Sequence, residues 1–268
     1  MTTSITDKNY KKLAIQVSLD GMSFCVFDTI SNNPLLLQKL PYTNMQRSTK
    51  MEDLLESVYL ENPELKHNYD EILVIHSNNL STFVPIALFD EEFLGSYLQY
   101  NTKVFETDFF TFDALEKYEI NHVYIPYVNM NNFFIDQYGT FDYKHANTIL
   151  VSKLLDLSKN KEERKMFVHV NESHFEIVVV QNQKLLLFNS FEYKTPEDFI
   201  YYVLFTAEQL QLNPENFRLE FLGAISESDV FYQIAYKYIR NISLLDVSEI
   251  KNTLTEQENR EHFILLNS

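Results

Sequence analysis

Cysteine, glycine and basic residues are scarce in this chain, and each scarcity narrows the kind of site it can hold. The single cysteine, Cys25, rules out an intramolecular disulfide and a multi-cysteine metal site, and it fits a reducing compartment. No apolar run approaches the ~18 residues of a membrane span, so we expect no membrane insertion. The N-terminal segment lacks the apolar core of a secretory signal, and we therefore expect a cytoplasmic protein.

Basic residues are outnumbered by acidic ones, 22 against 38, which gives a formal net charge of −16. Nucleic acids and anionic membranes bind clustered Lys and Arg, so we expect no nucleic-acid partner. Only four glycines are present. Phosphate-binding loops use glycine to bring backbone N–H groups close to the ligand, and we therefore expect no bound nucleotide cofactor and no metal.

Hydrophobic residues make up 45% of the chain, enough for a packed core, and their pattern repeats. The first half predicts strands at 13–19, 23–28 and 35–40, a helix at 48–59 capped by Ser48 or Thr49, and a strand at 69–76. The second half predicts strands at 166–170, 175–180 and 184–190, a helix at 196–211 and a strand at 217–222. Equivalent positions lie about 150 residues apart, which indicates a duplication. A helix at 144–159 is expected to join the halves.

Three antiparallel strands, a helix and a parallel strand, present twice, resemble the ribonuclease-H-like unit that is duplicated in the actin-like ATPase and sugar-kinase superfamily. Residues 12–247 also resemble a bacterial domain-of-unknown-function family with that fold. The resemblance implies an α/β protein with two actin-like halves, 1–140 and 141–268, and a cleft between them. The first half carries an aromatic-rich insertion at about 80–118.

Active members of that superfamily carry Asp-x-Gly in the first hairpin of each half, where Asp holds the metal or water and Gly admits phosphate. The matching positions here are Gln16 and Ser18 in the first hairpin, and His169 and Asn171 in the second. Neither pair supplies a carboxylate for Mg²⁺, and both place side chains where phosphates need space. We interpret both as degenerate phosphate loops, and we expect no catalytic residue.

Five further residues near these loops leave two interpretations open. Asp20 and Gly21 suit a hairpin tip or a phosphate contact in the cleft. Gly223 and Ser226 suit the adenosine side of that cleft, although Ser226 as a helix cap explains the same pattern. His174 suits a polar turn, or an acid–base or metal site with the neighbouring histidine.

The insertion is dense in aromatic residues, which indicates either the core of a subdomain or a surface for a partner protein. The candidates for a partner surface are Phe89, Phe93, Tyr97, Phe105 and Phe109. We therefore predict a non-catalytic actin-like protein, not an enzyme, that acts by binding an unknown protein partner. The alternative is a nucleotide-binding or phosphotransfer enzyme with atypical loops in the cleft between its halves.

Overall fold

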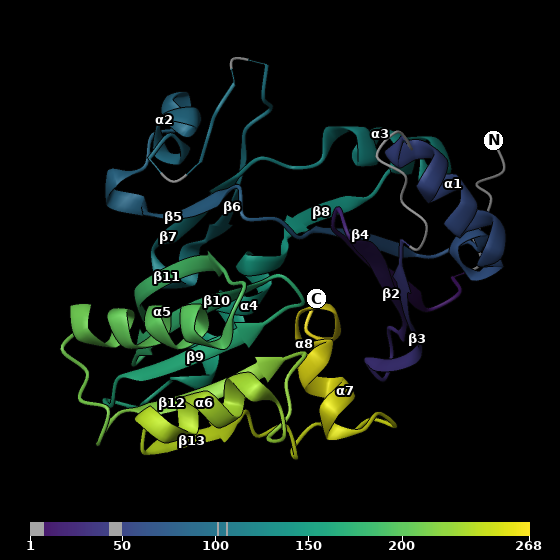
Figure 1. Ribbon diagram of the computed structural model, residues 1–268. Coiled ribbons are helices and arrows are strands. Elements are labelled where there is room, and N and C mark those ends of the chain that lie inside the picture. The colour runs from purple at the N-terminus through teal and green to yellow at the C-terminus, as the bar shows by residue number, and fades with distance from the viewer. Residues whose placement is uncertain (1–7, 43–49, 101, 106) are drawn as a thin grey trace, which may run out of the picture. The chain divides into compact units, whose positions relative to one another are not determined.

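The computed structural model describes residues 8–42, 50–100, 102–105 and 107–268 (Figure 1). Ser48 and Thr49, the expected caps of the first helix, lie outside the described residues. The chain divides into two compact units. The first consists of Met1–Ala114, Glu119–Thr148 and Ser268, and the second of Leu115–Tyr118 and Ile149–Asn267.

The first unit is built on a five-stranded sheet in the order β3-β2-β1-β4-β8. The first three strands are antiparallel, and β4 and β8 run parallel to β1. Two helices pack their apolar residues against the sheet and bury its core. The elements are β1 (Lys11–Val17), β2 (Gly21–Asp28), β3 (Asn33–Pro41), α1 (Met51–Glu61), η1 (Pro63–Lys66), β4 (Glu71–His76), α3 (Val128–Tyr138) and β8 (Asp142–His145).

The second unit repeats this plan with a sheet in the order β11-β10-β9-β12-β13. Its helix α5 begins with a capping box, in which Thr195 and Asp198 satisfy each other's backbone N–H groups, and with Pro196 in the first turn. The elements are α4 (Ala146–Leu157), β9 (Lys165–Val170), β10 (His174–Gln181), β11 (Lys184–Glu192), α5 (Pro196–Gln209), β12 (Arg218–Gly223), α6 (Val230–Tyr238), β13 (Asn241–Leu244), α7 (Glu256–Glu261) and α8 (Phe263–Leu266).

The strand registers of the two sheets correspond closely. Val17, at the end of β1, lies opposite His76 of β4, and Val170, at the end of β9, lies opposite Gly223 of β12. Each sheet also has a register shift between its second and third strands. The expected α/β fold of duplicated units is thus confirmed, with each unit ordered strand-strand-strand-helix-strand-helix-strand.

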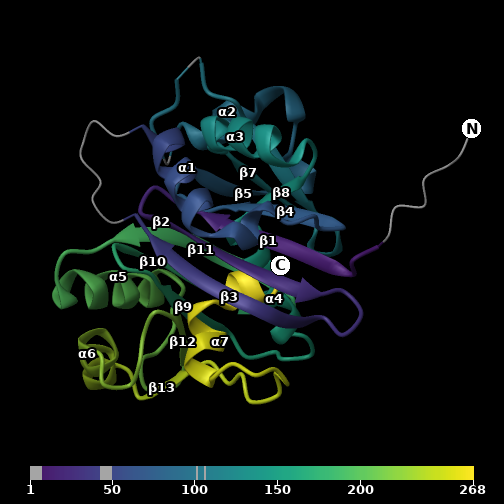
Figure 2. The same ribbon diagram turned by 90° about the vertical axis from the view of Figure 1, so that its right-hand side faces the viewer.

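The inserted segment between β4 and α3 forms a small sheet of its own, in the order β5-β7-β6. In this sheet β5 pairs with β7 (Figure 2). β7 directly follows the range 80–118 and belongs to this sheet. Val84, Leu98, Val123 and Ile125 form its core, with aromatic rings packed around them. The elements are β5 (Ser81–Pro85), η2 (Ile86–Leu88), η3 (Glu91–Phe93), α2 (Leu94–Leu98), β6 (Thr111–Leu115), η4 (Glu116–Tyr118) and β7 (Ile120–Tyr124).

One element differs from the pattern predicted in the joining segment. The expected helix at 144–159 begins only at Ala146, because Lys144 and His145 end the short strand β8. Parallel pairing with β4 places His145 opposite His76, so tertiary pairing overrides the local helical pattern. Across the described ranges, every helix is too short or too polar to cross a membrane.

Candidate functional site

The first hairpin, between β1 and β2, contains the expected phosphate-loop positions Gln16 and Ser18, and its own hydrogen bonds close it. The Ser18 hydroxyl donates to the Gly21 carbonyl at 3.1 Å and accepts from the backbone N–H groups of Asp20 and Gly21, both at 3.2 Å. The Ser18 N–H donates to the same carbonyl at 3.0 Å. Two N–H groups that could serve a phosphate are therefore already bound to Ser18.

Asp20 and Gly21 form the tip of this hairpin. Asp20 is exposed, and its carbonyl accepts from the Tyr42 N–H at 3.1 Å. A Cβ atom at Gly21 would lie 3.0 Å from the Leu40 carbonyl oxygen and 3.1 Å from the Pro41 Cα. The close approach of β3 therefore accounts for a glycine at this position without any ligand.

The second hairpin, between β9 and β10, brings His169, Asn171 and His174 together around one buried carboxylate. Glu176 accepts from His169 Nδ1 at 2.8 Å and from Asn171 Nδ2 at 3.0 Å, and its other oxygen contacts His174 Nε2 at 3.1 Å. His169 lies directly opposite Glu176 in the strand register, so the two side chains share one face of the sheet. His169, Asn171 and His174 therefore pair with the buried carboxylate of Glu176 within the hairpin itself.

The carboxyl group of Glu176 is ionised at neutral pH. Burial alone would raise its pKa, but the charge of His174 and the hydrogen bond from His169 hold the pKa well below its ordinary value. A phosphate group at this hairpin would meet a buried negative charge, which disfavours binding. Over the part of the chain that the structure describes, no three His, Cys, Asp or Glu side chains are grouped to hold a metal ion. The contacts of His169, Asn171 and His174 with Glu176 form a network that fixes the hairpin.

Gly223, considered for the adenosine side of a nucleotide site, ends β12 in close contact with β9. Its φ is +90°, and a Cβ atom there would lie 2.3 Å from the Val170 carbonyl oxygen. The next N–H along the chain, from Ala224, donates to that carbonyl at 2.8 Å. Strand packing and a left-handed backbone thus require glycine at this position.

The cap of the following helix, α6, is Asp229, so the expectation that Ser226 caps it is wrong. The Asp229 carboxylate accepts from the Phe231 N–H at 2.9 Å. Ser226 lies earlier in the loop, with its hydroxyl 3.0 Å from that of Ser228. A carboxylate at this position satisfies a terminal N–H group and complements the positive end of the helix. The α6 N-terminus therefore already holds an anionic group from the chain itself.

Two buried histidines at the carboxyl ends of β4 and β8 were not predicted from the sequence. His76 and His145 lie opposite each other in the strand register, and both are fully buried. His76 Nδ1 accepts from the Tyr127 N–H at 3.3 Å, so Nε2 carries the proton and donates to Asn131 Oδ1 at 2.9 Å. Both ring nitrogens of His76 are thus used by the fold.

Asp113, from β6, joins this region by accepting three hydrogen bonds. Its donors are the Tyr124 hydroxyl at 3.0 Å, the Thr148 hydroxyl at 2.5 Å and the His145 N–H at 2.9 Å. Because Thr148 gives its proton to Asp113, it accepts from His122 Nδ1 at 2.8 Å. A chain of polar groups therefore connects the insertion to the end of the main sheet within the first unit.

The titration of this network is strongly shifted by burial. Burial lowers the pKa of His76 to about 4, and burial together with His145 holds the pKa of His122 well below its ordinary value. Burial also raises the pKa of Asp113, against the opposing effect of its hydrogen-bond donors. Burial thus holds His76 and His122 neutral near pH 7. Each lies alone in an apolar segment of the sequence, and only the tertiary pairing brings the polar groups together.

The aromatic residues considered for a partner surface divide into two groups. Phe89 and Tyr97 stack with ring centroids 6.1 Å apart and pack against the core of the insertion. Phe93, Phe105 and Phe109 remain 55%, 53% and 53% exposed. The insertion therefore has an internal aromatic core and a separate set of exposed rings.

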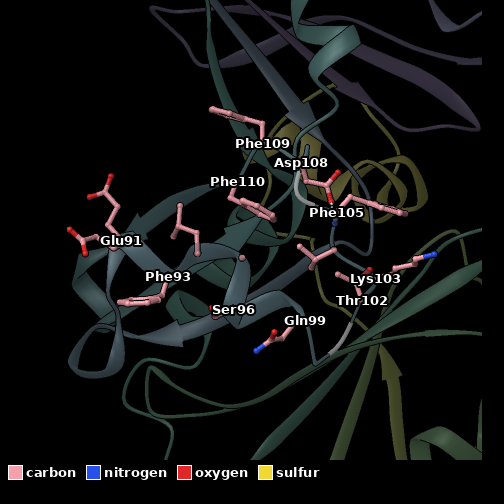
Figure 3. A pocket seen from close by; sticks show the side chains of 14 residues that line it. Glu91, Phe93, Ser96, Gln99, Thr102, Lys103, Phe105, Asp108, Phe109 and Phe110 are labelled. Atoms are coloured by element: carbon pink, nitrogen blue, oxygen red, sulfur yellow. Dashed lines mark hydrogen bonds between the residues drawn. The ribbon is translucent and has the colours of Figure 1, made fainter.

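The three exposed rings line a hollow of about 760 Å³ formed by η3, α2 and the described residues 102–105 and 108–110 (Figure 3). Phe110 packs on α2, where a Cβ atom at Gly95 would lie 3.2 Å from its ring, so glycine admits the ring. Phe93 and Phe105 lie on opposite sides of the hollow. The Lys103 ammonium group lies 5.0 Å from the Phe105 ring centroid. We call this feature, with its exposed phenylalanines, the aromatic hollow.

A sequence comparison identifies the family. The profile of the family described as "Protein of unknown function (DUF3822)" matches residues 1–242. The chain belongs to the DUF3822 family. The predicted resemblance to such a family is thereby confirmed. No curated protein is significantly similar to this DUF3822 member in sequence.

Solved structures establish the fold of this DUF3822 member. A protein with an actin-like ATPase fold and unknown function from Bacteroides thetaiotaomicron superposes with a TM-score of 0.83 at 23% identity, over 100% of both chains. A chain of a PilM-PilN type IV pilus biogenesis complex gives 0.55 at 11% identity, over 96% of each chain. The ethanolamine utilization protein EutJ from Carboxydothermus hydrogenoformans gives 0.52 at 7% identity, over 96% of this chain and 90% of the other. The protein has the actin-like ATPase fold.

Proposed function

We propose that this protein is a non-catalytic member of the actin-like fold that acts by binding another protein. The observation that carries the proposal is the closure of both hairpins, at the positions that the resemblance to the actin-like ATPase superfamily matches to phosphate loops. In the first, Ser18 binds the N–H groups of Asp20 and Gly21. In the second, His169 and Asn171 bind Glu176. Each hairpin thus satisfies its own polar groups without a ligand.

Binding of MgATP at either hairpin would require these bonds to break. Each lost hydrogen bond costs about 1 kcal/mol, and an uncompensated buried charge costs several. Neither Gln16 nor His169 can supply the carboxylate that would hold Mg²⁺. The contacts of MgATP with the protein would first have to offset these costs, which supports a role without nucleotide chemistry.

The aromatic hollow supports the second part of the proposal, the binding of a protein. Burying the exposed half of a phenylalanine ring gains about 2 kcal/mol, so three such rings offer a useful share of a binding energy. Exposed rings gathered around one hollow are unusual on a surface that binds nothing. The similar fold in the PilM-PilN complex shows that one protein of this architecture was solved with a partner.

Nucleotide binding is tested by thermal shift with MgATP and MgADP at about 5 mM. A ligand present at 100 times its Kd would stabilise the protein by about 2.7 kcal/mol. We expect no change in Tm for the wild type. A clear shift that Ser18→Ala or His169→Ala abolishes would contradict the non-catalytic proposal.

Partner binding is tested by affinity capture from the native cell extract with three forms of the protein. The wild type and a Tyr201→Ser/Phe205→Ser control, altered at exposed aromatics of α5, should retain the same interacting protein. A Phe105→Ser/Phe109→Ser variant should lose it while keeping its Tm, since exposed substitutions cost little stability. Retention by this variant would remove the aromatic hollow as the docking surface.

A further inference from the structure

The charges around the aromatic hollow are distributed unevenly. Its described lining residues include the acidic Glu91, Glu92 and Asp108 and the basic Lys103. Glu91 lies at the side of the hollow that Phe93 lines (Figure 3), the adjacent Glu92 also lines the hollow, and both are exposed. The Lys103 ammonium group lies over the Phe105 ring and makes a cation–π contact with it. One side of the hollow is therefore acidic, and the Lys103 ammonium group already contacts the Phe105 ring.

The carboxylates on this side are available to an incoming group. The Asp90 side chain is used within the fold, because it accepts from the Glu92 N–H at 3.0 Å and caps η3. Asp108 is likewise used, since it accepts from the Phe105 N–H at 2.8 Å. No ion pair reaches Glu91 or Glu92 from any residue that the structure places.

We infer that the aromatic hollow takes a short segment of another protein that carries Lys or Arg beside apolar side chains. This inference rests on the proposed function and specifies its partner. The apolar side chains would bury Phe93, Phe105 and Phe109, and the cation would meet Glu91 and Glu92. Arg and Lys suit this position because their apolar stems pack on aromatic rings while the charged end reaches a carboxylate.

Charge complementarity favours a segment with basic and apolar side chains over other occupants of the aromatic hollow. An anionic membrane or a nucleotide would be repelled by the acidic side and by the net charge of −16. A second copy of the chain would place like charges against each other in an isologous contact. A neutral apolar segment would leave two carboxylates facing an interface without a partner.

The inference is tested with three fluorescent peptides of about 12 residues that share one apolar pattern of Leu and Phe. Their remaining positions are Lys, Glu or Ser, so hydrophobicity is matched while charge varies. Fluorescence anisotropy measures binding to the full chain at about 50 and about 500 mM NaCl. We expect the Lys peptide to bind about tenfold more tightly than the Ser peptide at low salt, and the Glu peptide to bind most weakly.

Two variants assign the effect to this surface. Glu91→Gln/Glu92→Gln should weaken the Lys peptide about fivefold at low salt and leave the Ser peptide unchanged. Glu56→Gln/Glu61→Gln, an equal charge change at exposed positions of α1, should leave both unchanged. Equal weakening by the two pairs would mean attraction to the net charge alone, and would overturn the inference.

The outcomes also separate this inference from the proposed function. A Ser peptide that binds as tightly as the Lys peptide, and is lost with Phe105→Ser/Phe109→Ser, leaves protein docking in place but overturns the basic partner. A Lys peptide that binds no more tightly than about 1 mM overturns the inference as well. Binding of MgATP would instead contradict the proposed function, whatever the peptides do.

Discussion

His76 predicts a specific sensitivity of this protein to acid. The side chain is fully buried, and burial lowers its pKa from an ordinary 6.5 to about 4. In the unfolded chain the same imidazole takes up a proton near its ordinary pKa. Between these two pKa values the unfolded state binds more protons, so the free energy of unfolding falls as the pH falls through this window.

The magnitude follows from the two pKa values. At about pH 5 the difference in proton binding corresponds to about 2 kcal/mol of lost stability, and below about pH 4 the loss reaches about 3 kcal/mol. This is a large fraction of the stability of an ordinary domain. At neutral pH both states hold a neutral imidazole, and the effect is absent.

The test compares urea unfolding of the wild type and His76→Gln at about pH 7.5 and about pH 5. Circular dichroism is the suitable signal because the chain has no tryptophan. The glutamine amide can still donate to Asn131 but cannot titrate. We expect the variant to lose about 2 kcal/mol less than the wild type on acidification.

A matched control uses His67→Gln, because His67 is exposed. This substitution should leave the pH dependence of unfolding unchanged. If the wild type and His76→Gln lose the same stability between the two pH values, the neutral buried imidazole is not the cause, and the hydrogen-bond assignment at His76 fails.

Three further predictions concern positions with a defined packing role. Gly223→Ala should lower the free energy of unfolding, measured in urea, by about 3 kcal/mol or more, because its Cβ would lie 2.3 Å from the Val170 carbonyl oxygen. Gly139→Ala, in open space at φ +74°, should lower it by only about 1 kcal/mol. Equal losses would refute the packing argument. Glu176→Gln should cost about 3 kcal/mol at pH 7. It should lose less stability than the wild type as the pH falls below 4.5, because the stability that comes from the depressed pKa of Glu176 is complete above that value and is lost progressively below it. Leu98→Ala should cost about 3 kcal/mol, as a fully buried core residue of the insertion; a cost below about 1 kcal/mol would show that this core is loosely packed.

The duplication could be predicted from the sequence because strand alternation and turn residues are local signals. Gln16 and His169 occupy equivalent positions in the two sheets, since each lies one residue before a strand end that the registers make equivalent. β8 was missed because its four residues are polar in sequence and only His145 is buried. A strand that is stabilised by pairing with β4 has no pattern of its own to detect.

The polar network of the first unit could not have been predicted in the same way. His76, Asp113 and His145 are far apart in the chain, and only the tertiary pairing brings them together. The cap of α6 was misassigned because Ser226 and Asp229 both suit a cap, and only backbone geometry distinguishes them. Sequence composition indicated an aromatic role for the insertion, but exposure of Phe105 and burial around Phe89 depend on packing.

The two hairpins give an independent argument about how this fold came to its present form. Duplication makes them equivalent, yet a serine hydroxyl closes the first and a histidine–glutamate network closes the second. A shared phosphate ligand would demand similar donors in both, because backbone N–H groups and a carboxylate-held cation are what phosphate chemistry uses. Different closures are expected when each loop has only to satisfy its own buried polar groups.

The same contrast holds one strand further along, where His76 of β4 is equivalent to Gly223 of β12. At the first position both ring nitrogens of His76 are hydrogen-bonded, and at the second Gly223 packs directly against the backbone of Val170. Each unit has therefore been stabilised separately, which supports a fold retained as a scaffold and a function placed on the aromatic hollow of its insertion.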